Sequence, residues 1–268
     1  MTDPHQVLAD LTAEGKVLDG LLSGLDEAGW KTPTPAPGWT IHHQIAHLSQ
    51  IFDMAGLAAG DPEAFTAMTS RLSDDFNANV DAAMKPYLAQ EPGELLATWR
   101  GKVAASVANL GAVPPDQTVP WLVRPLPPAI LACAGIMETL GHGQDVLDAL
   151  GVEREWTDRI VHLVGFAVLV QDFGYEARGL NPPTVPFRYE LTLPSGTPWE
   201  FGPEDAENRI SGPASDFCLL VLRRRHRDDL ALTAAGGAAN LHLDVAQAYR
   251  GPAGAGRQPG QFATSATS

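Results

Sequence analysis

The segment 129–150 constrains the fold of this chain more than any other. It is long enough for a helix of several turns, and apolar residues occupy nearly every side of it. A helix that is apolar all round has to be enclosed by other elements. Within the segment, Glu138, His142 and Asp145 stand at positions i, i+4 and i+7, a spacing that places them on one helix face. The sequence therefore predicts a buried central helix with a polar face.

A buried ionised carboxylate costs several kcal/mol unless it is paired, hydrogen-bonded or bound to a metal. The pair Glu138 and His142, one helical turn apart, is therefore a candidate clip for a metal ion. The alternative is a helix whose glutamate and histidine only form hydrogen bonds to each other or to neighbouring groups. Two ligands do not make a metal site, so this segment alone leaves both interpretations open.

A second expected helix, 40–58, carries three histidines. His47 lies at the flank of its apolar face, whereas His42 and His43 lie further from the core. A single histidine at such an edge is more often a structural group than a ligand. Because the helix 129–150 carries a glutamate and a histidine, His47 is nevertheless a candidate for the third ligand of one metal site. We take His43 as a candidate catalytic residue beside it.

The first 180 residues show apolar positions at helical spacing and predict one helical domain, 1–180. Its expected helices are 3–25, 40–58, 65–83, 95–110, 129–150 and 155–178, and the proline-containing stretches 31–39 and 113–128 are expected to be loops.

After residue 186 the pattern changes to short alternating segments. We expect strands at 187–193, 199–201, 208–210 and 230–232, with helices at 214–225 and 238–249. This pattern predicts a small α+β domain, 181–250. The Gly/Ala/Ser/Thr-rich tail, 251–268, is expected to be disordered.

The composition narrows the classes of partner. A net charge of −14 disfavours nucleic acid and anionic membrane surfaces. No apolar run approaches the roughly 18 residues of a membrane span, and the acidic, polar start predicts no signal peptide. Two cysteines in apolar surroundings, Cys133 and Cys218, make a disulfide framework implausible. We expect a cytoplasmic protein, a monomer or homodimer, that acts on a small molecule.

Two motifs resemble the mycothiol-dependent maleylpyruvate isomerase family, part of the DinB-like superfamily of metal-binding four-helix bundles. They are Gly38-Trp39-Thr40 followed by Gln44-Ile-Ala-His47-Leu48, and Glu138-Thr-Leu-Gly-His142-Gly-Gln-Asp145. The resemblance implies an α+β protein with an N-terminal up-down four-helix bundle and a smaller C-terminal domain similar to sterol carrier proteins. It also implies that His47, Glu138 and His142 bind zinc.

The residues and the resemblance together suggest a chemistry. Two imidazoles and one carboxylate suit Zn²⁺, with Ni²⁺, Fe²⁺ or Mn²⁺ as alternatives. Three protein ligands leave at least one coordination position open, which is typical of a catalytic site. Neither cysteine has the surroundings of a nucleophile, so a reacting thiol has to be external. The resemblance implies that this thiol is mycothiol, and that the enzyme is an isomerase or a thiol S-transferase.

Three further residues are candidates for the site. Asp145 is placed to orient a ligand histidine, although a plain interhelical hydrogen bond explains it equally well. Arg223, in the run 223–225, is a candidate for binding a substrate carboxylate, and so is Arg124 in the loop 113–128. The alternative for the run is a solvated helix end.

Two other functions compete with the thiol-dependent enzyme. One is a hydrolase or isomerase that uses metal-activated water without a thiol. The other is a non-catalytic carrier of an apolar ligand, in which the metal only braces the bundle.

Overall fold

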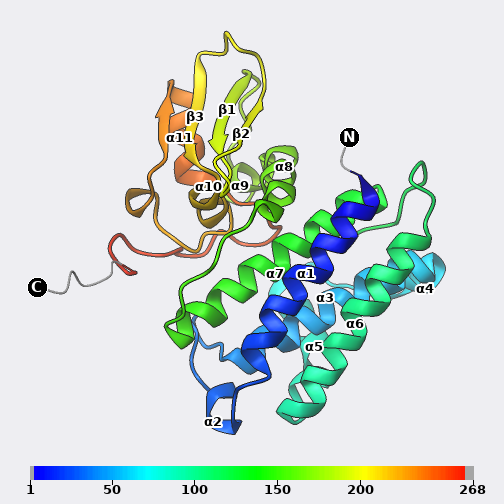
Figure 1. Cartoon of the computed structure of the whole chain (residues 1–268). Coiled ribbons are helices and arrows are strands. Elements are labelled where there is room, and N and C mark those ends of the chain that lie inside the picture. The colour runs from blue at the N-terminus through cyan, green and yellow to red at the C-terminus, as the bar shows by residue number, and fades with distance from the viewer. Residues whose placement is uncertain (1–2, 263–268) are drawn as a thin grey trace, which may run out of the picture. The chain divides into compact units, whose positions relative to one another are not determined.

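The computed structural model describes residues 3–262. The chain divides into two compact units, residues 1–154 and residues 155–268. The first unit is helical, and the second contains a four-stranded sheet with helices (Figure 1). This α+β layout confirms the fold class expected from the sequence. Among residues 3–262, no helix is both long and apolar enough to cross a membrane.

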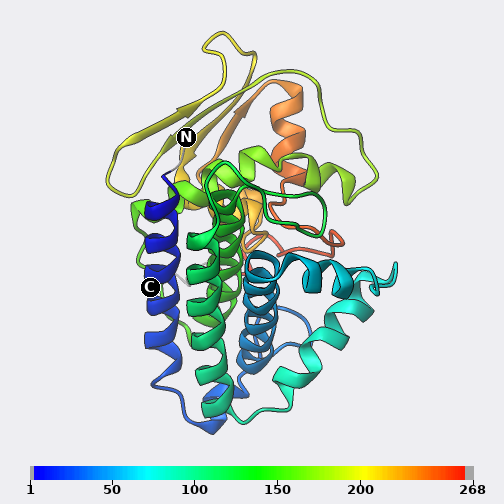
Figure 2. The same ribbon diagram turned by 90° about the vertical axis from the view of Figure 1, so that its right-hand side faces the viewer.

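Four helices form the bundle of the first unit: α1 (Pro4–Leu22), α3 (Ile41–Gly60), α6 (Pro92–Ala112) and α7 (Pro128–Leu150). Helices α1 and α3 each pack against both α6 and α7, which also contact each other (Figure 2). The centre of the bundle is filled by large apolar side chains that are almost fully buried, among them Leu11, Ile45, Phe52, Trp99 and Leu140. The predicted four-helix bundle is therefore present.

Helix α7 has the central position that its composition predicts, because buried residues occur along almost its whole length. A Cβ atom on Gly135 would lie 3.2 Å from the Phe52 ring and 3.3 Å from Leu11, so glycine lets α7 approach α3 and α1 closely. The helix begins with Pro128 in its first turn and ends at Gly151, whose φ of 65° is the left-handed conformation that glycine adopts easily.

Two expected helices are interrupted in the structure. The segment 65–83 contains parts of two helices, α4 (Pro62–Thr69) and α5 (Phe76–Leu88), because Asp75 starts a new helix by accepting a hydrogen bond from the Ala78 amide. The segment 155–178 contains a 3₁₀ turn (Asp158–Ile160), α8 (Val161–Leu169) and α9 (Asp172–Glu176). A short helix, α2 (Glu27–Trp30), lies between α1 and α3.

The sheet of the second unit has the strand order β2-β1-β3-β4. Strand β1 (Phe187–Thr192) pairs antiparallel with β2 (Pro198–Phe201) and parallel with β3 (Asn208–Pro213). Strand β4 (Thr233–Ala235) pairs antiparallel with β3, three residues later than the strand expected at 230–232. Helices α10 (Ala214–Val221) and α11 (Gly237–Val245) pack against the sheet (Figure 1).

The boundary between the units lies at residue 154, not near residue 180 as expected from the sequence. Helix α8 packs against α10, so this segment belongs to the core of the second unit. Periodicity identifies the segment as helical but does not indicate which unit buries it.

Part of the expected disordered tail makes defined contacts. The Gly260 amide donates to the Asp229 carboxylate at 2.8 Å, and the Arg225 guanidinium lies 4.0 Å from the centre of the Phe262 ring. The overall Gly/Ala/Ser/Thr composition of the tail does not predict these contacts, because each of them depends on a single residue. Residues 263–268 of the expected tail lie outside the described residues.

An aromatic cluster fills the core of the second unit and encloses His242. The His242 ring lies 5.6 Å from Phe187 and 5.8 Å from Tyr175, and its Nδ1 is buried without a hydrogen-bond partner among the described residues. Burial disfavours the charged imidazolium and lowers the pKa of His242 to about 4. We therefore expect His242 to be neutral at pH 7.

This burial predicts a pH-dependent stability. Between pH 6.5 and pH 4, His242 binds more protons in the unfolded chain than in the folded one. The free energy of unfolding therefore keeps its full value above pH 6.5. As the pH falls from 6.5 towards 4, it decreases by up to about 1.4 kcal/mol per pH unit. Chemical denaturation of the wild type, His242→Phe and His242→Gln across this range should show a smaller pH dependence in both variants. Equal slopes in all three proteins would contradict the assignment.

Candidate metal centre

The structure brings together the three residues that the sequence suggests as metal ligands. His47 comes from α3, and Glu138 and His142 come from α7. Each offers one ligand atom, and these atoms all lie within 4.8 Å of one another. Glu138 Oε2 lies 3.3 Å from His142 Nε2 and 3.9 Å from His47 Nε2. We call these three residues the triad.

The donors of the triad fit a divalent metal. Metal–ligand bonds of 2.0–2.2 Å in a tetrahedral zinc site place neighbouring ligand atoms about 3.4 Å apart. The two distances from Glu138, 3.3 and 3.9 Å, are close to this value. The side chains of His47, Glu138 and His142 are 12%, 18% and 14% exposed, so the cluster is largely buried but still reachable from solvent. Three protein ligands are the number found in catalytic zinc sites, which keep a fourth coordination position open.

Trp39 covers the two histidines of the triad. Its ring centre lies 5.9 Å from that of His142, with the planes inclined by only 21°, and 5.5 Å from that of His47. The loop that carries Trp39 folds back on itself through the bridge between Pro33 and Thr40. The indole thus gives the site an apolar wall. The periodicity of the sequence does not identify this role, and the only signal for it is the Gly38-Trp39-Thr40 motif.

A buried amide links the triad to its surroundings. Gln44 on α3 is completely buried, and its Oε1 lies 2.5 Å from His142 Nδ1. Its Nε2 donates to Thr34 Oγ1 at 2.9 Å and to Asp145 Oδ2 at 3.4 Å. Asp145, expected to orient a ligand histidine, thus reaches His142 through Gln44. Gln44 was not among the candidates, because its partner His142 lies 98 residues away in the sequence.

The other two histidines of α3 are held by local contacts. His43 Nδ1 accepts a hydrogen bond from the Thr40 amide at 3.3 Å, which closes the first turn of the helix. The ring of His42 packs edge-on against Trp30 at 5.9 Å, and burial lowers the pKa of His42. The catalytic role suggested for His43 stays a prediction.

The two arginines suggested for substrate binding lie in different parts of the chain. Arg124 is exposed in the loop between α6 and α7. Arg223 follows α10 in the second unit and has a φ of 58°, a left-handed conformation that costs a non-glycine residue about 1 kcal/mol. It occupies the position after the helix end where glycine is usual, with the Arg224 amide donating back to the Leu219 carbonyl. Their substrate-binding role stays a prediction.

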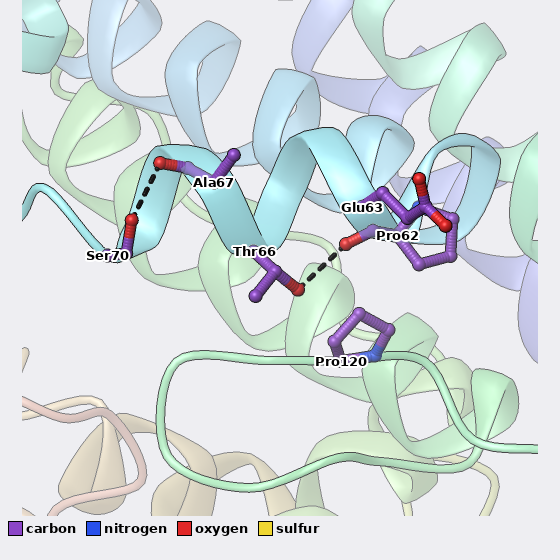
Figure 3. Close-up of a pocket in the computed structure, with 6 residues that line it drawn as sticks. All are labelled: Pro62, Glu63, Thr66, Ala67, Ser70 and Pro120. Carbon is purple, nitrogen blue, oxygen red and sulfur yellow. Dashed lines mark hydrogen bonds between the residues drawn. The ribbon is translucent and has the colours of Figure 1, made fainter.

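An open pocket of 580 Å³ lies between α4 and Pro120 of the loop that precedes α7 (Figure 3). The hydroxyls of Thr66 and Ser70 bond to carbonyls of their own helix, as the dashed lines show (Figure 3). The pocket wall is therefore mostly apolar, without the convergent polar groups of a binding site. None of its lining residues belongs to the triad or to the Gln44 network, so we do not assign a function to it.

The helical bundle and its His-Glu-His cluster make the first unit a four-helix bundle with a candidate metal site. Residues 11–147 match the family model of the mycothiol maleylpyruvate isomerase N-terminal domain. The chain belongs to this family. Residues 184–235 match a second family model, described as wyosine base formation.

Two curated relatives are the uncharacterized proteins Rv0036c and MT0041 from two strains of Mycobacterium tuberculosis. Each is 41% identical to this chain over 257 residues, which are 96% of this chain and 100% of the relative. Two crystal structures of the mycothiol-dependent maleylpyruvate isomerase, one of a mutant, share the fold with TM-scores of 0.59 and 0.56. Both are 17% identical, and the match covers 87% of this chain and 93% of theirs.

The geometry of the triad predicts the effect of removing one ligand. His47→Ala leaves only two donors. Mutating a hydrogen-bond partner of a metal ligand typically lowers metal affinity by roughly 10- to 100-fold, and we expect a larger decrease when the ligand itself is removed. His42→Ala is the matched control, since it removes a half-buried histidine of the same helix that packs against Trp30. Elemental mass spectrometry after dialysis should find near-stoichiometric metal in the wild type and the control only. Equal metal in all three proteins would rule out His47 as a ligand.

Proposed function

We propose that this chain is a metal-dependent enzyme that activates mycothiol for isomerisation or S-transfer on a small organic substrate. His47, Glu138 and His142 hold the metal. The observation that carries the proposal is the convergence of three ligand atoms within 4.8 Å in a largely buried position that leaves coordination room. Zn²⁺ suits two imidazoles and one carboxylate best, and Ni²⁺ and Fe²⁺ are the alternatives.

A bound divalent metal supplies a positive charge that lowers the pKa of a thiol or a water and polarises a carbonyl group. The protein residues provide the binding site and its surroundings. Trp39 shields His47 and His142 on one side with an apolar surface, which strengthens electrostatic interactions inside the site. His43 is the proposed proton carrier, and since its Nδ1 is engaged by Thr40, the proton would move through Nε2.

The reacting thiol has to come from outside the chain. Burial raises the pKa of the Cys133 thiol to about 12, so Cys133 stays protonated and is a poor nucleophile. Cys218 is also buried, with its thiol 4.0 Å from the Ile160 carbonyl. Because neither buried thiol is part of a disulfide, both agree with the reducing cytoplasm in which we propose that the protein works.

For the substrate we propose a small unsaturated acid such as maleylpyruvate, after which the isomerase of the two similar crystal structures is named. Arg223 and Arg124 are the proposed partners of its carboxylate, because a guanidinium binds a carboxylate through two parallel hydrogen bonds. We propose that the enzyme works as a monomer or a homodimer.

Substitution with Co²⁺ tests directly whether the mycothiol sulfur binds the metal. In Co²⁺-loaded protein, adding mycothiol should produce a sulfur-to-cobalt charge-transfer absorption, because a thiolate enters the open coordination position. The same titration of His47→Ala is the control and should give no such band. A cobalt-loaded wild type whose spectrum does not change at saturating mycothiol would contradict thiol activation at this metal.

An activity assay separates the three candidate functions. Maleylpyruvate and related unsaturated acids are offered to the zinc-loaded protein with and without mycothiol, and isomers and thioethers are measured. We expect turnover only with mycothiol, and a loss of at least about 100-fold in His47→Ala, typical of removing a group that acts in the transition state. Turnover without thiol would favour the metal-water enzyme. Binding of an apolar ligand without any turnover would favour the carrier.

A further inference from the structure

We propose that Gln44 is a positioning residue that keeps His142 in the tautomer able to bind a metal through Nε2. The inference rests on the proposed function, since it concerns the same triad, and it assigns a role to a side chain outside the ligand set. Gln44 has the two properties that such a role needs: it is completely buried, and its amide contacts the Nδ1 atom of His142, on the side of the ring away from Glu138.

The neighbours of Gln44 determine the orientation of its amide. The Thr34 hydroxyl donates its hydrogen to the Trp39 carbonyl at 3.0 Å, so towards Gln44 it can only accept. The Asp145 carboxylate oxygen, 3.4 Å from Gln44 Nε2, is a second acceptor. Because both neighbours are acceptors, the NH₂ group of Gln44 has to face them. The reversed amide would place its oxygen against two other oxygens.

The oriented amide of Gln44 in turn determines the tautomer of His142. With its NH₂ group directed at Thr34 and Asp145, Gln44 presents Oε1 to His142 Nδ1 at 2.5 Å. An oxygen acceptor at this distance requires a hydrogen on Nδ1. In the neutral imidazole Nε2 then carries the lone pair, and Nε2 is the atom that lies 3.3 Å from Glu138 Oε2 within the triad.

The Nδ1–H tautomer of His142 needs this support because Glu138 favours the other tautomer. Without Gln44, the neutral ring gains a hydrogen bond by carrying its hydrogen on Nε2 and donating it to Glu138, and this tautomer cannot bind a metal there. Gln44 opposes that arrangement by supplying the acceptor on the other side of the ring. Because Thr34 and Trp39 share one loop, the same network also holds the indole that stacks on His142.

The experiment compares zinc affinity in three variants by competition with a chelator. Gln44→Leu should weaken zinc binding by about 10- to 100-fold, as is typical when the partner of a ligand histidine is lost. Gln144→Leu is the matched control: Gln144 is a buried glutamine of α7 whose amide contacts Arg154 and Asp148, so its loss should leave zinc affinity unchanged. The double variant Gln44→Glu with Asp145→Asn exchanges donor and acceptor at constant charge. The Thr34 hydroxyl can then turn to donate to the new carboxylate, because the Trp39 carbonyl keeps the Thr34 amide as its donor, so the variant should recover most of the affinity.

A second measurement does not depend on metal or activity. Nitrogen-15 NMR of the metal-free protein at alkaline pH reports which nitrogen of His142 carries the hydrogen, with the signals assigned by their loss in His142→Ala. We expect the Nδ1–H tautomer in the wild type and in the double variant, and an increased share of the Nε2–H tautomer in Gln44→Leu. Unfolding curves of each variant confirm that the folded state is being compared.

The outcomes distinguish the inference from the function on which it rests. Wild-type zinc affinity and an unchanged Nδ1–H tautomer in Gln44→Leu would overturn the role of Gln44. An affinity of the double variant as low as that of Gln44→Leu would also overturn it, because Gln44 would then only fill space. If the wild type binds zinc but never reacts with mycothiol, the proposed function fails and the role of Gln44 stands. If Gln44→Leu does not fold, the double variant still decides the question.

Discussion

The burial of a polar helix face inside an apolar bundle is the constraint on which the structure of the first unit depends. Helix α7 contacts the other three helices of the bundle, so Glu138, His142 and Asp145 have little access to water. Each such group needs a partner, because burial without one costs several kcal/mol. The bundle supplies these partners from α3, which contributes His47 and Gln44.

The site is built in two layers with different tasks. The inner layer, His47, Glu138 and His142, has the three donor atoms of the candidate metal site. The outer layer consists of Gln44, Thr34, Asp145 and Trp39, which fix the ring of His142 or cover it. Helix α3 contributes to both layers, through His47 and Gln44, and the loop that precedes it contributes Thr34 and Trp39 to the outer layer. We therefore expect a change in that loop to alter the surroundings of His142.

The second unit has its own core, in which His242 is surrounded by Tyr175, Phe187 and Tyr189. Its match to a model described as wyosine base formation, and the match of the first unit to the isomerase family, concern separate stretches of the chain. The chemistry proposed here rests on the first unit. Only the proposed substrate-binding role of Arg223 involves a residue of the second unit.

Periodicity and spacing within a single helix are enough to predict the helical bundle, the central place of α7 and the pair of Glu138 and His142. His47 lies on another helix, and its place beside that pair was implied by the family motifs. Helical spacing puts Glu138 and His142 on one face in any structure that contains α7. Which groups meet across helices depends on tertiary packing. The contact between Gln44 and His142 joins residues 98 positions apart, and no local pattern encodes it. The boundary at residue 154 and the partners of the tail were decided in the same way, by which buried surfaces pack together.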